Sequence, residues 1–406
     1  MGSEWTTCRL SEIADIQTGP FGSQLHNEDY VRIGTPIVTV EHLGKRCFSA
    51  QNLPKVSEKD KKRLSKYTLT AGDTVFSRVG SVDRSSFVKI EYDGWMFSGR
   101  CLRVRPDKSR VYSEYLYYAL NAETTKQQIR NIAVGATMPS INTKLLGEVI
   151  IKLPEYFLQR DIAATLSSLD DKIELNNRII ANLEAQAQAI FKSWFVDFEP
   201  FQDGEFVDSE LGMIPKGWRV GTLSEITSIT MGQSPSGTSF NEKGIGTVFY
   251  QGRAEFGFRF PSRRLFTTEP KRMALDGDVL MSVRAPVGDI NVATEECCIG
   301  RGLCSLHSII GCQSYLLYEI KKMHDMLDKF NGEGTVFGSI NKKGLNQLPV
   351  LIPLDDAIYA FEQNARKIDL EILNLYKQNI RLERTRDTLL PKLMSGEIEV
   401  LVEDIE

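Results

Sequence analysis

In this chain of 406 residues, thirteen basic residues have a type and spacing that suggest a chemical role. They are Lys61, Lys62, Arg63, Arg78, Arg100, Arg103, Arg105, Arg253, Arg259, Arg263, Arg264, Arg284 and Arg301. Clustered lysines and arginines can neutralise phosphates with release of counterions, and an arginine can also bind the edge of a guanine through two hydrogen bonds. Each cluster could equally be an ordinary solvated face. The chemistry that these residues favour is binding to a nucleic acid, in which no covalent bond changes.

Catalytic motifs are absent from the sequence. It has no G-x-x-x-x-G-K-[ST] phosphate loop, no G-x-G-x-x-G dinucleotide turn, no H-E-x-x-H, no G-x-S-x-G elbow and no Asn-Pro-Pro-aromatic signature of adenine methyltransferases. A nuclease-like fragment such as residues 319–321 is expected by chance in so charged a chain. Cys297, Cys298, Cys304 and His307 include no C-x-x-C pair, so they do not indicate zinc. We expect no catalytic residue and no metal site.

Charge is unevenly distributed along the chain. The total is -4, from 49 basic and 53 acidic residues, and taken alone it argues against a nucleic-acid partner. By segment, the net charge is +5 over residues 1–155, -7 over 156–210, +3 over 211–354 and -5 over 355–406. Two basic regions therefore alternate with two acidic ones. The basic regions suit phosphate, whereas the acidic regions suit protein partners.

The composition is that of a globular protein. Charged residues make up 25% and hydrophobic residues 42% of the chain, which excludes disordered and fibrous classes. No run approaches about 18 apolar residues, and the first residues do not read as a secretory signal. The seven cysteines are odd in number and scattered, which suits reduced thiols better than a disulfide framework. We expect a cytoplasmic protein that does not span a membrane.

The chain contains an internal repeat. The matching segments are 10–13 with 223–226, 72–73 with 277–278, 99–100 with 300–301 and 140–142 with 339–341, at offsets that fall from 213 to 199 residues. In each copy, short apolar runs after a Gly-Asp pair predict strands, and the stretches 115–132 and 315–330 read as helical. The alternation of Phe256, Phe258 and Phe260 with Arg259 indicates a half-buried strand rather than a platform for stacked bases. Each copy therefore begins with a mixed α/β region, and we call residues 1–155 lobe 1 and residues 217–354 lobe 2.

A heptad seam follows each lobe. Ten positions between Ile162 and Trp194, spaced alternately by four and three residues, are apolar except for Asn176. The seam recurs 199 residues later, between Phe361 and Leu393, with Asn379 and Arg386 as exceptions. Such seams predict two coiled-coil helices.

The two asparagines favour an antiparallel pair. With the helix ends level, Asn176 lies opposite Asn379 and the buried amides can hydrogen-bond, whereas a parallel pair would bury each against an aliphatic side chain. We predict that the asparagines fix the register, although each could instead reach water at the edge of the seam. Arg386 is then expected at an exposed edge or a partner contact. Two similar lobes related by a pseudo-twofold axis suit a ligand with two separated half-sites, and duplex DNA is the obvious candidate.

Several segments together resemble the specificity (S) subunit of type I restriction-modification systems. They are IFKSWFVDF at 190–198, GMIPKGW at 212–218, LPKLMSGEI at 390–398, and the Gly-Asp pairs followed by Ser77-Arg78 and Ser282. The resemblance covers essentially the whole chain. It implies an α+β protein in which two target-recognition domains are separated by two long helices that form an antiparallel coiled coil.

The resemblance and the patterns above give the domain boundaries. We expect target-recognition domain 1 at 1–155, a central coiled-coil helix at 156–197, a linker at 198–216, target-recognition domain 2 at 217–354, a C-terminal coiled-coil helix at 355–394 and a tail at 395–406.

The resemblance also implies function and partners. In that family each lobe reads one half of a bipartite DNA target, while the helices set the spacer and dock two methylation (M) subunits. Two restriction (R) subunits complete the nuclease, and S-adenosylmethionine, ATP and Mg²⁺ belong to these partners. This chain would then be a non-catalytic subunit without a cofactor of its own.

The family's DNA contacts follow no fixed motif, so the thirteen basic residues remain a prediction from charge. Arg78 and Arg284 follow serine-containing apolar runs and are better placed to read bases than a lysine run. The repeated loops at 135–142 and 334–341 resemble loops of that family and could lie near the DNA or the coiled coil, or be purely structural turns. Alternatives are a scaffold whose lobes bind proteins or glycans, a nuclease with an unrecognised site, and the companion subunit of a combined restriction-methylation enzyme.

Overall fold

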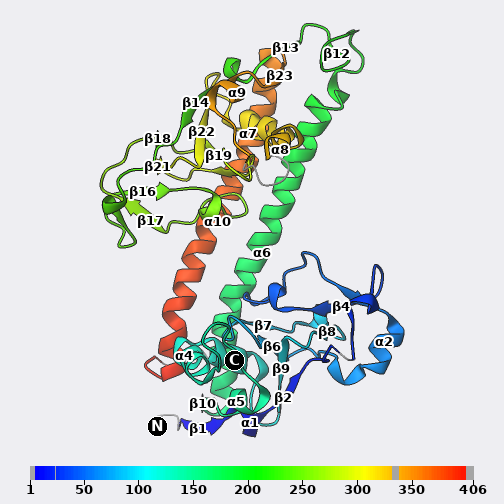
Figure 1. Cartoon of the computed structure of the whole chain (residues 1–406), viewed down its shortest axis with the longest axis vertical. Coiled ribbons are helices and arrows are strands. Elements are labelled where there is room, and N and C mark those ends of the chain that lie inside the picture. Colours follow the sequence, from blue (N-terminus) through cyan, green and yellow to red (C-terminus); the bar gives the residue numbers. More distant parts are fainter. Residues whose placement is uncertain (1–4, 23, 332–337, 399–406) are drawn as a thin grey trace, which may run out of the picture. The chain divides into compact units, whose positions relative to one another are not determined.

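The computed structural model describes residues 5–22, 24–331 and 338–398, which fall into two compact units. Unit 1 comprises Met1–Asn177 and Lys377–Glu406, and unit 2 comprises Arg178–Tyr376. Two long helices, α6 (Tyr156–Phe195) and α10 (Asp355–Ser395), each contribute one part to each unit (Figure 1). Each unit is therefore a lobe together with segments of both helices.

Lobe 1 contains two four-stranded sheets and one two-stranded sheet. The first has the order β2-β9-β6-β7 and is antiparallel throughout, the second has the order β3-β5-β4-β8 with β4 and β8 parallel, and β1 pairs with β10. The strands are β1 (Thr6–Arg9), β2 (Ala14–Thr18), β3 (Tyr30–Val31), β4 (Thr35–Val38), β5 (Lys55–Val56), β6 (Thr74–Ser77), β7 (Ser85–Phe87), β8 (Met96–Phe97), β9 (Cys101–Pro106) and β10 (Ile150–Leu153). The β1-β10 pair closes the lobe just before α6 begins.

Lobe 2 repeats this strand order, with one strand more, β18, at the edge of its second sheet. Its sheets are β14-β22-β19-β20, β15-β17-β16-β21-β18 with β16 and β21 parallel, and the pair β13-β23. The strands are β13 (Arg219–Thr222), β14 (Thr227–Met231), β15 (Phe240–Asn241), β16 (Thr247–Tyr250), β17 (Leu265–Thr267), β18 (Met273–Ala274), β19 (Val279–Ser282), β20 (Ile290–Val292), β21 (Cys297–Ile299), β22 (Leu303–Ser308) and β23 (Pro349–Ile352). The pair β11 (Phe206–Val207) and β12 (Ile214–Pro215) precedes the lobe. The internal repeat of the sequence thus corresponds to a repeat of topology.

The repeated Gly-Asp pair forms the same turn in both lobes. The glycines have φ of +99° and +85°, a region that favours glycine. The Asp73 carboxylate accepts a hydrogen bond from the backbone N–H of Thr70 at 2.8 Å, and Asp278 accepts one from Leu275 at 2.9 Å. These turns lead into β6 and β19, in which every residue is buried.

The helical stretches predicted at 115–132 and 315–330 are each divided in two. Lobe 1 has α3 (Ser113–Asn121) and α4 (Glu123–Ile132), which meet at an extended Ala122, and lobe 2 has α7 (Gln313–Lys322) and α8 (His324–Asp328). The division has a packing reason. Six successive residues of α3 are buried, whereas α4 buries only Thr125 and Ile129, so a single straight helix could not present both faces to the core.

The shorter helices are α1 (Leu10–Ile13), α2 (Glu58–Arg63), α5 (Thr143–Gly147) and α9 (Lys342–Asn346). The repeated Ser-Ile-Asn segment ends in the N-cap of α5 or α9. Asn142 accepts from the N–H of Leu145 at 2.8 Å, and Asn341 accepts from Gly344 at 2.9 Å. Part of the second predicted loop, residues 334–337, lies outside the described residues.

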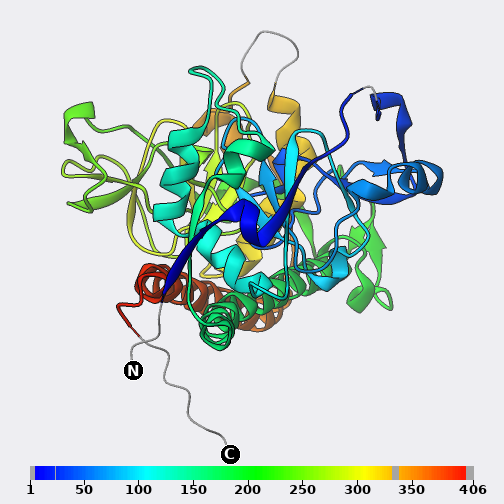
Figure 2. The same ribbon diagram turned by 90° about the horizontal axis from the view of Figure 1, so that it is seen from below.

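Every seam position of α6 and α10 is buried or half-buried. In unit 1, Ile162 and Leu393 belong to one hydrophobic cluster, and the two helix segments lie side by side (Figures 1 and 2). In unit 2, Ile180 and Leu375 share a cluster, and the ring centroids of Trp194 and Phe361 are 6.2 Å apart. These are contacts expected of a level antiparallel register. Within the described ranges, no helix is long and apolar enough to cross a bilayer.

Candidate nucleic-acid interface

One edge of lobe 1 brings Arg78 and Arg100 together. At the end of the β6-β9 ladder, the backbone N–H of Arg78 donates to the carbonyl of Arg100 at 2.8 Å. The half-buried Arg78 side chain donates from Nη1 to the carbonyl of Gly99 at 3.2 Å, and its guanidinium lies 5.6 Å from the ring centroid of Phe21. Arg100 is exposed, and so is 54% of Phe21. This edge therefore presents two cations beside an exposed aromatic ring.

The corresponding edge of lobe 2 has the same backbone arrangement. The N–H of Val283 donates to the carbonyl of Gly302 at 2.9 Å, at the end of the β19-β22 ladder. Arg284 follows Val283, and Arg301 precedes Gly302. Both arginines are exposed. Each lobe thus carries two of the predicted arginines on the same edge, which we call the arginine edge.

Arg78 and Arg284 are not equivalent positions on this edge. Arg284 forms an isolated bridge with Ser339, whereas in lobe 1 the residue that bridges Ser140 is Val79. Arg78 is therefore one residue nearer to the sheet, which is consistent with its half-buried side chain. Both arginines still lie beside the Ser-Ile-Asn segment of their own lobe.

Glycines hold a loop over the arginine edge. A Cβ on Gly19 would lie 2.2 Å from the carbonyl oxygen of Ser98, and one on Gly232 would lie 2.2 Å from that of Gly300. Only glycine permits such close approaches of two backbones. In lobe 1 the loop held in this way carries Phe21, which the sequence prediction missed although its glycine neighbours could have indicated an exposed aromatic residue.

Arg103 is a correction to the prediction. Its side chain is buried in lobe 1, where Nη2 donates to Asp15 at 2.7 Å and Nη1 donates to the carbonyls of Lys66 and Thr68 at 3.2 and 3.3 Å. Arg105, two residues along β9, is partly exposed and binds the carboxylate of Asp73 through Nε and Nη2 at 2.8 and 2.7 Å. Both arginines bind β9 to the segment that precedes β6, so their positive charges stabilise the fold.

Arg259 is a second correction. It is 5% exposed, and its guanidinium donates to Glu184 and to Asp369 within unit 2. The predicted half-buried strand around it is wrong as well. Residues 256–261 form a turn closed by a bridge between Phe256 and Pro261, and Phe258 is 72% exposed. The turn reverses the direction of the side chains, so the arginine points inward.

The remaining predicted cations lie on the surface of their own lobes. Lys61, Lys62 and Arg63 form the last turn of α2, and Arg63 binds Asp60 at 2.8 Å. The three remaining predicted arginines of lobe 2 each have an acidic partner: Arg253 has Asp289, Arg263 has Glu295, and Arg264 has Glu255. The pairs of Arg253 and Arg263 have accessible acidic partners, and such surface pairs contribute little and can be exchanged for a phosphate contact, whereas the Glu255 partner of Arg264 is buried.

The two predicted register residues are in contact. In unit 1, Nδ2 of Asn176 donates to Oδ1 of Asn379 at 2.8 Å, and Nδ2 of Asn379 donates to Oδ1 of Asn177 at 2.9 Å. Asn176 is 0% and Asn379 is 6% exposed, so neither side chain reaches water at the seam edge. Arg386, expected at an exposed edge or a partner contact, is half-buried and donates to the buried Asp170 at 2.6 Å.

The cysteines and histidines do not form a metal centre in the part of the chain that the structure describes. Cys297, Cys298 and Cys304 are buried free thiols. Burial raises the pKa of Cys304 to about 12, which disfavours the thiolate that binds metals. His307 Nδ1 lies 2.7 Å from Oδ1 of Asp278, the carboxylate of the Gly-Asp turn.

Comparison with known proteins decides the family. The model of the type I restriction modification DNA specificity domain matches residues 2–185 and again residues 215–392. The chain belongs to this family. The two matches correspond to the two copies of the repeat, so the chain is a type I specificity subunit with two recognition domains, and such subunits are non-catalytic DNA-recognition proteins.

Relatives extend over nearly the whole chain. The chain is 32% identical to the MjaX specificity subunit of Methanocaldococcus jannaschii, covering 98% of this chain and 94% of that one. It is 24% identical to the HindI specificity subunit of Haemophilus influenzae, covering 84% and 89% of the two chains. The fold resembles the crystal structure of a type I system S subunit from M. genitalium, with a TM-score of 0.62 at 17% identity over 96% of each chain.

Proposed function

We propose that each lobe of this specificity subunit reads one half of a bipartite, asymmetric DNA target. The observation that carries the proposal is the arginine edge. Each lobe forms it from equivalent strands and an equivalent backbone hydrogen bond. Phosphate contacts position a protein on DNA, whereas contacts to base edges specify the sequence. Arg78, Arg100, Arg284 and Arg301 are our candidates for base contacts, and Lys61, Lys62 and Arg63 are our candidates for phosphate contacts.

We further propose that α6 and α10 pair as one antiparallel coiled coil and relate the lobes by a pseudo-twofold axis. Support comes from the buried seams and from the hydrogen bond between Asn176 and Asn379. A helix pair of fixed length would hold the half-sites at a fixed separation, and the bases between them would not be read. On this proposal, residues 156–197 and 355–394 are the coiled-coil helices, 198–216 is a linker and 395–406 is a tail.

The acidic segments are the proposed docking sites for protein partners. Net charges of -7 over residues 156–210 and -5 over 355–406 disfavour phosphate and suit the basic surface of another subunit. We propose that these helices dock two methylation subunits and that two restriction subunits complete the complex. S-adenosylmethionine, ATP and Mg²⁺ would be bound by those partners, and this chain would act in the cytoplasm.

Methylome sequencing tests the proposal. Cells that produce this chain with its methylation subunit should modify adenines in one bipartite motif with an unspecified spacer, and cells with the methylation subunit alone should not. A mobility-shift assay of the purified complex should show the same preference. Binding without any sequence preference would contradict the proposal and favour a scaffold that binds proteins or glycans.

A further inference from the structure

A buried arginine joins lobe 2 to both long helices in unit 2. Arg259 lies just after η8 (Arg253–Glu255), and its Nη1 donates to Glu184 of α6 and, at 3.1 Å, to the hydroxyl of Tyr318 on α7. Its Nη2 donates to Oδ1 of Asp369 on α10 at 2.5 Å. Lys321 of α7 also binds Glu184. One guanidinium therefore contacts α6, α7 and α10.

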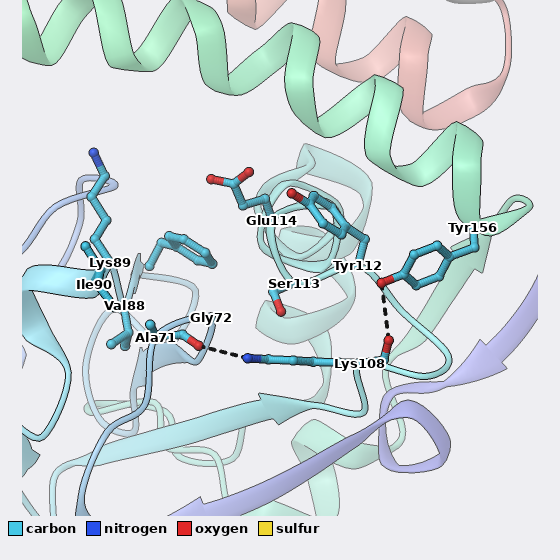
Figure 3. Close-up of a pocket in the computed structure, with 11 residues that line it drawn as sticks. Ala71, Gly72, Val88, Lys89, Ile90, Lys108, Tyr112, Ser113, Glu114 and Tyr156 are labelled. Atoms are coloured by element: carbon cyan, nitrogen blue, oxygen red, sulfur yellow. Dashed lines mark hydrogen bonds between the residues drawn. The ribbon is translucent and has the colours of Figure 1, made fainter.

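Lobe 1 has a corresponding buried arginine, Arg46, which joins it to α6 in unit 1. Arg46 follows η2 (Val40–His42) and is 8% exposed. Its Nη1 donates to Asp171 of α6 at 2.5 Å, and its Nη2 donates to Glu114 of α3 at 2.9 Å. Lys89 binds the neighbouring Glu174 of α6. Figure 3 shows Lys89 and Glu114 extending toward α6 from the wall of an open pocket of about 310 Å³.

The two arginines are equivalent positions of the repeat. Arg46 and Arg259 are separated by 213 residues, the offset of the first repeated segment. The carbonyl of Arg46 accepts from the N–H of Phe87 at 2.9 Å, and that of Arg259 accepts from Val292 at 2.8 Å; Phe87 and Val292 are separated by 205 residues, the offset of the Gly-Asp pairs. The repeat thus places a buried arginine against a long helix in both lobes.

In each unit, a tyrosine of the lobe also binds a carboxylate of a long helix. The hydroxyl of Tyr118 on α3 donates to Asp170 of α6 at 2.7 Å, and that of Tyr318 on α7 donates to Asp369 of α10 at 2.8 Å. Asp170 and Asp369 are separated by 199 residues, which is the offset of the helix seams. We call the arginine, the tyrosine and the helix carboxylates of each unit its clamp.

The clamps are directional contacts. Apolar packing between a lobe and a helix depends on buried area and little on angle. A guanidinium is a planar fork, and a buried charge is tolerated only where its partners are in place. In unit 2, burial opposes ionisation of Glu184, but the charges of Arg259 and Lys321 outweigh it and lower the carboxyl pKa. A rotation of the lobe on its helices would separate these charges and leave them buried without partners.

We propose that Arg46 and Arg259 are positioning residues for DNA reading, which fix the angle of each lobe on the helices and thereby the permitted distance between the two half-sites. The inference rests on the proposed bipartite function. On this inference, the spacer length depends on the clamps between lobe and helices as well as on the length of the helices. Neither arginine touches DNA on this account.

The test measures spacer preference in the complete methyltransferase complex. Wild type, Arg259→Met, Arg259→Lys, Arg46→Met and Arg46→Lys are compared on plasmids that carry the two native half-sites at the native spacer or at spacers one and two base pairs longer and shorter. The controls are Arg219→Met and Arg9→Met, because these arginines have exposed partners in Glu225 and Glu148. Methylation of each plasmid is quantified, and assembly of every variant is checked by gel filtration.

For the methionine variants we expect the ratio of methylation at the native spacer to that at altered spacers to fall by about tenfold or more, a change of roughly 1.4 kcal/mol. The lysine variants, which keep the charge but lose the fork, should fall between wild type and methionine, and the controls should match wild type. Equal loss of methylation at all spacers, or an unchanged ratio, would overturn the inference while leaving the bipartite function intact. Where a methionine variant does not assemble, the same criterion is applied to the lysine variant. A wild-type complex without spacer preference would instead contradict the proposed function itself.

Discussion

At the scale of single residues, the surroundings of each cation decide its role. Arg100 and Arg301 are exposed on the arginine edges, whereas Arg103 and Arg259 are buried among carboxylates and carbonyls of the protein. The sequence predicts the positions of positive charge but gives no information on the direction of a side chain. Direction depends on turns such as 256–261, which also bind residues distant in the sequence, such as Asn291.

Substitution should separate base contacts from phosphate contacts. Arg284→Gln is expected to reduce discrimination between the target and single-base variants by about 1–3 kcal/mol, with little change in the salt dependence of binding. Replacing Lys61, Lys62 and Arg63 together by Gln should weaken binding to all sequences and lower the salt slope by about 3. Binding isotherms of the complex at several salt concentrations measure both quantities. The reverse pattern would contradict the assignment.

The buried amide pair should show strong coupling. Asn176→Leu leaves the buried Asn379 with one partner fewer, at an expected cost of about 1–3 kcal/mol, while the double change to Leu should cost less than the sum of the single changes. Thermal unfolding of the four proteins of the cycle measures the coupling. Asn364→Leu, at an exposed site of α10, is the control. A unique, level helix alignment in the double variant, found by cross-linking, would show that the asparagines do not fix the register.

Glu319 predicts a dependence of stability on pH. It is 1% exposed, and burial raises its pKa despite Lys322 at 3.1 Å. A raised folded-state pKa gives stability that is present below the ordinary value of 4.5 and is lost as the pH rises through the folded-state value. Glu319→Gln should therefore raise the unfolding temperature at pH 7.5, and the gain should disappear near pH 4. Glu269→Gln, at an exposed site, should change little at either pH, and a lower unfolding temperature of Glu319→Gln at pH 7.5 would contradict the argument.

At the scale of elements, periodicity was the strongest predictor. The seam positions all lie at buried or half-buried sites because a heptad pattern is a local property of one helix. The repeat predicts the second lobe from the first, and the structure has the same strand order in both apart from the additional edge strand β18. The division of the 115–132 stretch at Ala122 was not predicted, because it depends on which face of each helix meets the sheets.

Lengthening both long helices tests their role as a spacer. One heptad inserted after Asn177 and another before Lys377 keeps both seams in phase and adds about 10.5 Å of helix. By axial rise alone, this equals about three base pairs of DNA at 3.4 Å each. We expect the methylated motif to gain a different spacer while both half-sites keep their bases. An unchanged spacer at full activity would contradict the account.

At the scale of the whole molecule, the total charge is a poor guide. The value of -4 combines two basic lobes with two acidic helical segments. The contacts between lobe and helices could not be predicted from these totals. The sequence analysis assigns Arg259 to DNA and does not single out Arg46, and both become internal contacts only when the lobe packs on the helices. Once the structure has identified the partners of Arg46 and Arg259, the offset of 213 residues shows that the two arginines are equivalent positions of the repeat.

The central claim is that two independent lobes read two half-sites. Exchange of residues 217–354 for the corresponding lobe of another specificity subunit, followed by methylome sequencing of cells that also produce the methylation subunit, tests it most directly. The account predicts a new motif in which one half-site is replaced and the other is identical to that of the parent. A motif in which both half-sites change, or neither does, would contradict the account.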